Sequence, residues 1–145
     1  MMQIRTSFHI ARAALLLALL ALAACTDSTA VALKEQARVA APGGKVDAVL
    51  AELATDATVG QAYEIHLVPA GSTRFATASL RADKAAGISL HWRDAHTLLI
   101  RCEAARIFAF SNFWQSAEVE NYTYTVALEL DGCRYPAAAP DKDKS

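Results

Sequence analysis

Apolar and polar residues alternate with a period of two along most of the chain. The longest run, Tyr122–Leu130, has Tyr, Val or Leu at every even position and Thr, Ala or Glu between them. Successive side chains of a strand point to opposite faces, so this pattern predicts a strand with one buried face. The pair Asp131-Gly132 is a turn signal and is expected to end it.

Shorter alternating runs predict six further strands between turn signals. They cover Lys45–Leu53, Tyr63–Leu67, Arg74–Arg81, Ile88–Trp92, Thr97–Cys102 and Arg106–Phe110. The segment Asp83–Gly87 is expected to be a turn. The run Leu33–Val39 permits one more strand, but the composition of Ala30–Ala41 equally permits a short helix.

Many short strands without a long helix predict an all-β fold, apart from that optional short helix near the N-terminus. The expected architecture is an antiparallel meander that forms a small sandwich or a partly closed barrel. A single domain is expected over residues 34–135, and the Ala, Pro, Asp and Lys composition of residues 136–145 predicts a disordered tail.

The first 24 residues have a different composition. Arg5, His9 and Arg12 precede a run, Ala13–Ala24, that contains only Ala and Leu. A basic start and a short apolar run are typical of a secretory signal peptide. The run is shorter than the roughly 20 residues that a membrane-spanning helix needs. Residues 1–24 are therefore predicted to be a signal peptide, and residues 25–33 a tether.

The tetrad Leu22-Ala23-Ala24-Cys25 resembles the lipobox of bacterial lipoproteins. The resemblance implies cleavage before Cys25 and acylation of its thiol with chains such as palmitate. It also implies a domain held by lipid in the periplasm of the cell envelope, with the membrane as a partner. Thr26 is not the Asp that retains such proteins at the inner membrane in enteric bacteria, which favours the outer membrane. The alternatives are a cleaved signal with a chance cysteine and an uncleaved anchor.

Charge argues against a nucleic-acid partner. Loss of Arg5 and Arg12 with the leader leaves 12 basic against 15 acidic residues, a formal net charge of −3. Nucleic-acid binding domains instead gather Lys and Arg on one face.

Two cysteines remain after Cys25. In an exported protein Cys102 and Cys133 most simply form a disulfide, and their separation of 31 residues corresponds to about 3–4 kcal/mol of loop entropy. Two free buried thiols and a metal-binding pair are the alternatives.

Candidate functional residues are few, and no catalytic residue, metal site or cofactor is predicted. Phe113 and Trp114 are expected in the core, or, if exposed, in a patch that binds a protein or glycan. The polar groups His91, Asp94 and His96 of one hairpin could ligate zinc, although solvated hairpin residues are the simpler interpretation.

A second resemblance spans roughly residues 45–114. Gly44-Lys45, Val68-Pro69-Ala70-Gly71, Trp92-Arg93-Asp94 and Asn112-Phe113-Trp114 resemble features of small uncharacterised β-rich bacterial lipoproteins. This resemblance implies a β-rich fold, but it implies no activity, because none is known for that family. The predicted function is a non-enzymatic binding or structural module of the envelope, with an unknown envelope protein as partner. The alternative is a periplasmic inhibitor or immunity protein against an enzyme or toxin.

Overall fold

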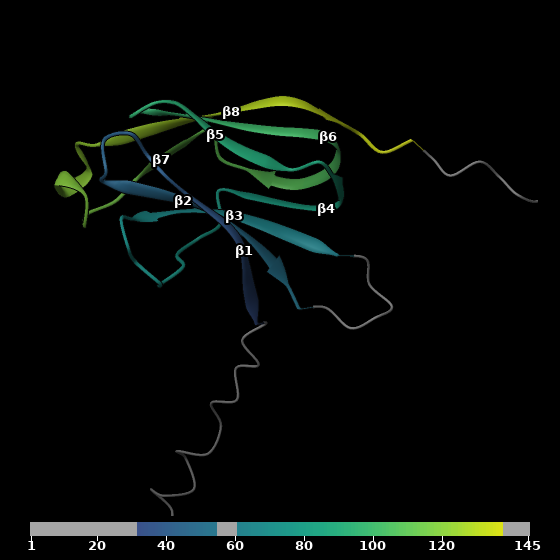
Figure 1. Cartoon of the computed structure of the whole chain (residues 1–145), viewed down its shortest axis with the longest axis horizontal. Helices are drawn as coiled ribbons and strands as arrows, with labels where there is room; N and C mark the ends of the chain where they lie inside the picture. Colours follow the sequence, from purple (N-terminus) through teal and green to yellow (C-terminus); the bar gives the residue numbers. More distant parts are fainter. Residues whose placement is uncertain (1–31, 55–60, 138–145) are drawn as a thin grey trace, which may run out of the picture. The chain divides into compact units, whose positions relative to one another are not determined.

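The structure is a computed structural model that describes residues 32–54 and 61–137. All these residues belong to one compact unit, shown in Figure 1. Within it, no helix has the length and apolar character needed to span a membrane. The elements in chain order are β1 (Leu33–Ala40), β2 (Val46–Leu53), β3 (Ala62–Pro69), β4 (Leu80–Ala86), β5 (Ser89–Asp94), β6 (Thr97–Phe110), β7 (Phe113–Gln115), the short 3-10 turn η2 (Glu120–Tyr122) and β8 (Thr125–Arg134).

The strands form one sheet in the order β1-β2-β3-β4-β6-β8-β7. Strand β5 is outside this order and pairs with the first half of β6. All pairs are antiparallel except β6 and β8, which run parallel. The sheet is antiparallel-rich and is not closed into a barrel. The prediction of an all-β, mainly antiparallel fold is therefore confirmed, and β6 with β8 is the one parallel pair in it.

The long strand β6 connects two parts of the sheet. Its first half pairs with β5 and β8, and its second half pairs with β4. The sheet folds over at β6, so that β6 and β8 lie above β2 and β3 in Figure 1. The sequence pattern predicted two separate strands here, because Glu103-Ala104 interrupts the apolar alternation.

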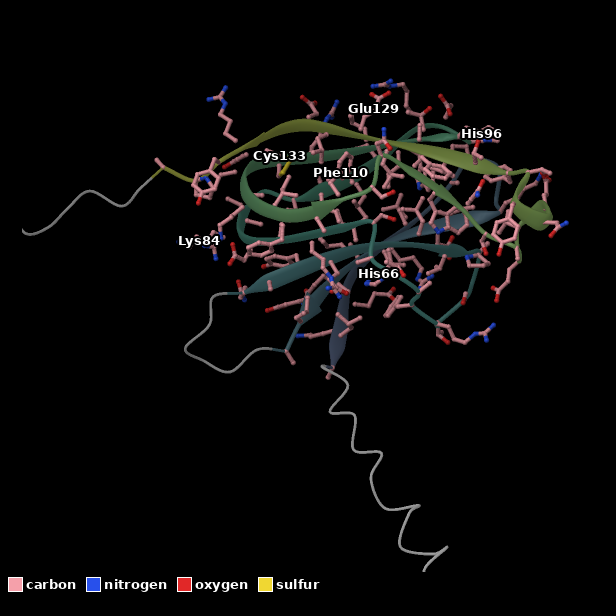
Figure 2. All side chains as sticks on the ribbon, turned by 180° about the vertical axis from the view of Figure 1, so that it is seen from behind. His66, Lys84, His96, Phe110, Glu129 and Cys133 are labelled. Atoms are coloured by element: carbon pink, nitrogen blue, oxygen red, sulfur yellow. A yellow bond between two sulfur atoms is a disulfide. The ribbon has the colours of Figure 1, made fainter. Side chains whose placement is uncertain are left out.

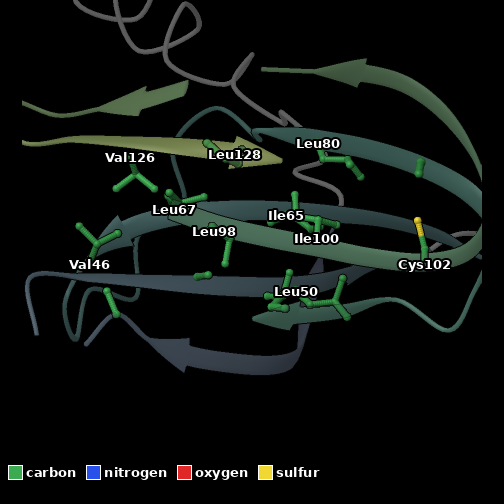
Figure 3. Packing of buried hydrophobic residues seen from close by; sticks show 14 of the residues in the cluster. Val46, Leu50, Ile65, Leu67, Leu80, Leu98, Ile100, Cys102, Val126 and Leu128 are labelled. Carbon is green, nitrogen blue, oxygen red and sulfur yellow. The ribbon is translucent and has the colours of Figure 1, made fainter. Parts of the chain in front are cut away.

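The core lies between these two layers (Figure 3). Its largest fully buried side chains come from β2, β3, β4, β6 and β8 and include Val46, Ile65, Leu67, Leu80, Leu98, Ile100 and Val126. These residues occupy alternate positions of their strands, which is why a period of two predicted them. Burial of apolar surface at about 25 cal/mol per Å² is the main stabilising contribution.

The other face of β2 is also buried. Every residue from Val46 to Ala51 is buried, including Asp47. The Asp47 carboxylate accepts hydrogen bonds from the Arg38 guanidinium at 3.0 Å and from the Gly71 N–H at 2.9 Å. These bonds hold the segment after β3 near β2, and they satisfy a buried charge that would otherwise be costly.

Two sequence-based assignments are wrong in the middle of the chain. Most of the predicted strand Arg74–Arg81 is irregular, and the predicted turn Asp83–Gly87 lies largely within β4. The guanidinium of Arg106 on β6 donates two hydrogen bonds to the Asp83 carboxylate, one of them 2.7 Å long. This ion pair lets a polar segment pair with β6. The alternative of a helix over Ala30–Ala41 is also wrong, because its described residues include strand β1.

A disulfide joins Cys102 of β6 to Cys133 of β8, with 4.6 Å between the Cα atoms. This is the pairing that the sequence indicates. Gly132 faces Cys102 in the parallel register, and its backbone has a φ of +84°. Asp131-Gly132 therefore does not end the strand, because pairing with β6 carries β8 on to Arg134.

Candidate functional site

The candidate site is a groove between the β3–β4 connection and the segment that begins with β7. Its main cavity, of about 270 Å³, is lined by Leu67, Val68, Pro69, Ser72, Arg74, Phe75, Ala76, Trp114, Gln115, Ser116 and Glu118. A second cavity of about 230 Å³ shares Trp114 and Gln115 with the first and is also lined by Thr77, Ala78, Ser79, Ser111 and Phe113. We call the two together the Trp114 groove.

One wall of the groove is the irregular connection that follows β3. Ser79 N–H donates to the Ile65 carbonyl at 2.7 Å, and the Nδ1 of His66 lies 3.1 Å from the Ala76 carbonyl oxygen. The ring of Phe75 stacks at 4.9 Å on the ring of His66. These contacts hold the wall against the outer face of β3, although the wall forms no strand.

His66 is the buried support of that wall and is labelled in Figure 2. Its side chain is only 2% exposed, and its Nε2 lies 2.9 Å from the Glu64 carboxylate. The other Glu64 oxygen pairs with the Arg81 guanidinium at 2.7 Å. Both ring nitrogens of His66 therefore have partners within the fold, so its role is to position the wall.

Strand β7 forms the opposite wall of the groove. It places the neighbouring residues Phe113 and Trp114 on opposite faces of the sheet. Phe113 pairs with exposed Ala127 and is itself 50% exposed, whereas Trp114 pairs with buried Val126. Trp114 is half-buried, packs against the core and lines both cavities. Trp114 thus fits the prediction of core packing in part, whereas Phe113 is exposed, as the alternative prediction has it.

The rim of the groove carries one ion pair. Arg74 on the β3–β4 connection donates to the Glu118 carboxylate at 3.2 Å. The two side chains are 83% and 54% exposed. An exposed pair of this kind adds less than about 1 kcal/mol to stability. Little free energy is therefore needed to break the contact between Arg74 and Glu118 across the rim.

A left-handed turn follows the groove. Glu120, Asn121 and Tyr122 have φ values of +49°, +47° and +67°. Consecutive left-handed residues other than glycine are costly and are concentrated at functional sites. The Glu120 carboxylate pairs with the Lys45 ammonium, whose pKa is raised by that hydrogen bond. Tyr122, at the end of this turn, is 54% exposed.

The hairpin that could have held zinc does not form a metal site. His91 lies 3.2 Å from the Ser89 hydroxyl, and the Nδ1 of His96 lies 2.8 Å from the Thr125 carbonyl oxygen. The Asp94 carboxylate instead accepts a hydrogen bond from the His96 N–H, which lowers the Asp94 pKa. Within residues 32–54 and 61–137, no three potential ligand side chains converge.

Other predicted site residues fall in two groups. Cys102 and Cys133 are joined in the structure. Cys25, with the predicted leader and most of the predicted tether, lies outside the described residues, as do residues 138–145 of the expected tail.

Comparison with known proteins gives no match, whether to family models, to curated proteins or to solved structures. The resemblance of residues 45–114 to small β-rich lipoproteins therefore stays a prediction.

Sequence reasoning missed the other wall of the groove. Arg74 and Phe75 lie in the segment Arg74–Arg81, which the alternation predicts to be a strand. The local pattern did not indicate this wall, because Glu64 and His66 are polar and alternate with apolar residues, as in a strand buried on one face. Only the structure shows that Glu64–Val68 is buried throughout and is therefore covered on both faces.

Proposed function

We propose that the chain is a lipid-anchored protein of the bacterial cell envelope whose β domain is a binding module. The observation that carries the proposal is the tetrad Leu22-Ala23-Ala24-Cys25 at the end of a basic and then apolar leader. Acylation of Cys25 would hold the domain at the membrane, because several acyl chains at about 0.8 kcal/mol per buried methylene make a stable anchor. The periplasm, at the outer membrane, is the proposed location.

The Trp114 groove is the proposed binding surface. It combines a half-buried tryptophan, a second aromatic ring at Phe75 and an open rim. Tryptophan and tyrosine commonly supply much of the binding energy at protein interfaces. The disulfide between Cys102 and Cys133 supports an oxidising location for the domain.

The polar groups of the groove support binding rather than catalysis. The Ser72 hydroxyl accepts the Arg74 N–H, and the Ser116 hydroxyl accepts the Glu118 N–H, each at 3.2 Å. Both serines thus stabilise local turns. The Arg74 and Glu118 side chains engage each other across the rim.

Metabolic labelling tests the anchor. In bacteria fed an alkyne-tagged palmitate, the wild-type chain should carry the label and sediment with membranes. The Cys25→Ala variant should lose the label. The Cys102→Ala/Cys133→Ala variant, which retains Cys25, is the matched control and should keep it. An unlabelled wild-type chain, or label that persists in Cys25→Ala, would refute the lipid anchor.

A further inference from the structure

The outer edge of β7 keeps backbone groups without a partner among the described residues. The Phe113 carbonyl is not one of them, because it accepts a hydrogen bond from the Ser111 hydroxyl at 2.7 Å. β7 is the last strand of the sheet and pairs only with β8. Leu128 N–H donates to the Asn112 carbonyl at 2.8 Å. Alternate residues of an antiparallel strand face its partner. Trp114 therefore shares the orientation of Asn112, and the backbone groups of Phe113 and Gln115 point away from β8.

This edge opens into the Trp114 groove. Phe113 and Gln115 line the second cavity, and Thr77–Ser79 line it from the other side. The main cavity continues beyond Trp114 over the apolar side chains of Leu67, Val68 and Phe75. Backbone donors and acceptors thus lie beside a pocket for an apolar side chain.

The opposite edge of the sheet, β1, is protected in a way that β7 is not. β1 carries exposed Lys34 and Glu35, a half-buried Arg38 and a register shift between Glu35 and Ala37. Charges and bulges of this kind prevent strand addition at sheet edges. The side chains of β7 are two aromatic rings and one uncharged amide.

We propose that an extended segment of a partner polypeptide adds to the β7 edge within the Trp114 groove. Its backbone pairs with the Phe113 N–H and with the N–H and carbonyl of Gln115, and one of its apolar side chains enters the cavity between Trp114 and Phe75. Strand addition takes affinity from main-chain bonds and specificity from pockets for alternate side chains. Arg74 and Glu118 neutralise each other at the rim, so the segment is uncharged there. The inference rests on the proposed binding function and names its ligand.

A random-peptide display library, selected against the full chain in detergent, tests the proposal. Enriched peptides should have apolar residues at alternating positions. Gln115→Pro removes the N–H that points to the free edge, and proline is tolerated on that side of an edge strand. It should weaken binding of an enriched synthetic peptide at least about tenfold, whereas Gln115→Ala, which keeps the N–H, should change it less than about threefold.

Amide hydrogen exchange of the wild-type chain keeps the test independent of variant folding. On addition of the enriched peptide, exchange at Phe113 and Gln115 should slow at least about tenfold, and exchange at Trp114, already paired with β8, should change little. Lack of any enriched peptide, unchanged exchange at those two amides, or equal losses in both Gln115 variants would overturn the proposal.

Purified peptidoglycan sacculi serve as a second probe in the same assay. If the chain binds sacculi but the library gives no enriched peptide, the proposed binding function stands and the proposed peptide ligand is refuted. Self-association of the chain through β7 without peptide binding would refute it as well. Failure of Cys25 labelling alongside normal peptide binding would refute only the anchor.

Discussion

Gly132 lies where β8 passes the carbonyl group of Cys102. Its backbone is left-handed, and a Cβ added there would lie 2.4 Å from the Cys102 carbonyl oxygen. Neither atom can move without disturbing the parallel β6/β8 pair, because both belong to the backbone or are bonded directly to it. We expect Gly132→Ala to lower the free energy of unfolding by about 3 kcal/mol or more, through strain and a steric clash. Urea unfolding of both chains measures the difference.

Gly44→Ala is the matched control for this substitution. Gly44 has a similar positive φ of +66°, but an added Cβ would meet no atom within 4 Å. The free energy of unfolding of this variant should therefore fall by only about 1–2 kcal/mol, the cost of the left-handed conformation for alanine. Equal losses at the two positions would show that the close approach to Cys102 has no energetic effect.

His66 and Glu64 show how single buried polar residues shape the site. Each is almost fully buried on the outer face of β3, and each has partners for its polar atoms. Buried polar groups without partners cost a few kcal/mol, so the contacts of His66 with Ala76 and Glu64 restrict where the groove wall can lie. The shape of the groove thus depends on residues beneath its surface.

At the scale of elements, β6 and β8 are joined both by hydrogen bonds and by the disulfide Cys102–Cys133. Removal of the cross-link frees a loop of 31 residues in the unfolded chain. We expect Cys102→Ala/Cys133→Ala to lower the free energy of unfolding by about 3–4 kcal/mol, because the unfolded chain gains entropy. The urea midpoint measures this loss.

Reduction of the wild-type chain provides the control for the disulfide. Dithiothreitol should shift the wild-type midpoint close to that of the double variant and leave the variant unchanged. A wild-type midpoint that does not respond to the reductant would contradict a stabilising bond between these cysteines.

At the scale of the whole molecule, paired carboxylates make stability depend on pH. Hydrogen bonds from Arg38, Arg106 and the His96 backbone lower the pKa values of Glu35, Asp83 and Asp94, respectively. A carboxyl group whose pKa is lowered in the folded state stabilises the fold at pH values above its ordinary pKa, near 4. This stabilisation is lost as the pH falls through the pKa of the folded state. We therefore expect the melting temperature to fall steeply below about pH 4.

The variant Asp83→Asn tests how much the ion pair between Asp83 and Arg106 contributes to this acid sensitivity. At pH 7 it should melt at a lower temperature than the wild type, because the ion pair with Arg106 is lost. As the pH falls through the lowered folded-state pKa of Asp83, the difference between the two melting temperatures should shrink, since protonation removes the charge that pairs with Arg106. Asp131→Asn, which removes an exposed pair with Arg101, should change little at either pH. A constant difference across the pH range would contradict the assignment.

Local pattern was enough to predict most of the strands and one half of the candidate site. The alternation in Lys45–Leu53 and Tyr63–Leu67 predicted β2 and β3 closely, and the aromatic pair drew attention to Phe113 and Trp114. Strand β4 was misplaced, because a polar segment can pair when a distant residue supplies the opposite charge. The other wall of the groove was missed for a similar reason, since its irregular backbone is held by side chains of β3.

By itself the sequence determined the all-β class, the approximate strands and the choice of cysteine partners. It also predicts the leader with its tetrad. These depend on local periodicity, local composition and simple pairing, which need no knowledge of neighbours in space. Only the tertiary structure decided that β8 runs parallel to β6, that Phe113 and Trp114 face opposite sides, and that the β3–β4 connection completes a groove. A period of two states which side chains share a face, but the partner strand is chosen by burial and hydrogen bonding between segments far apart in the chain.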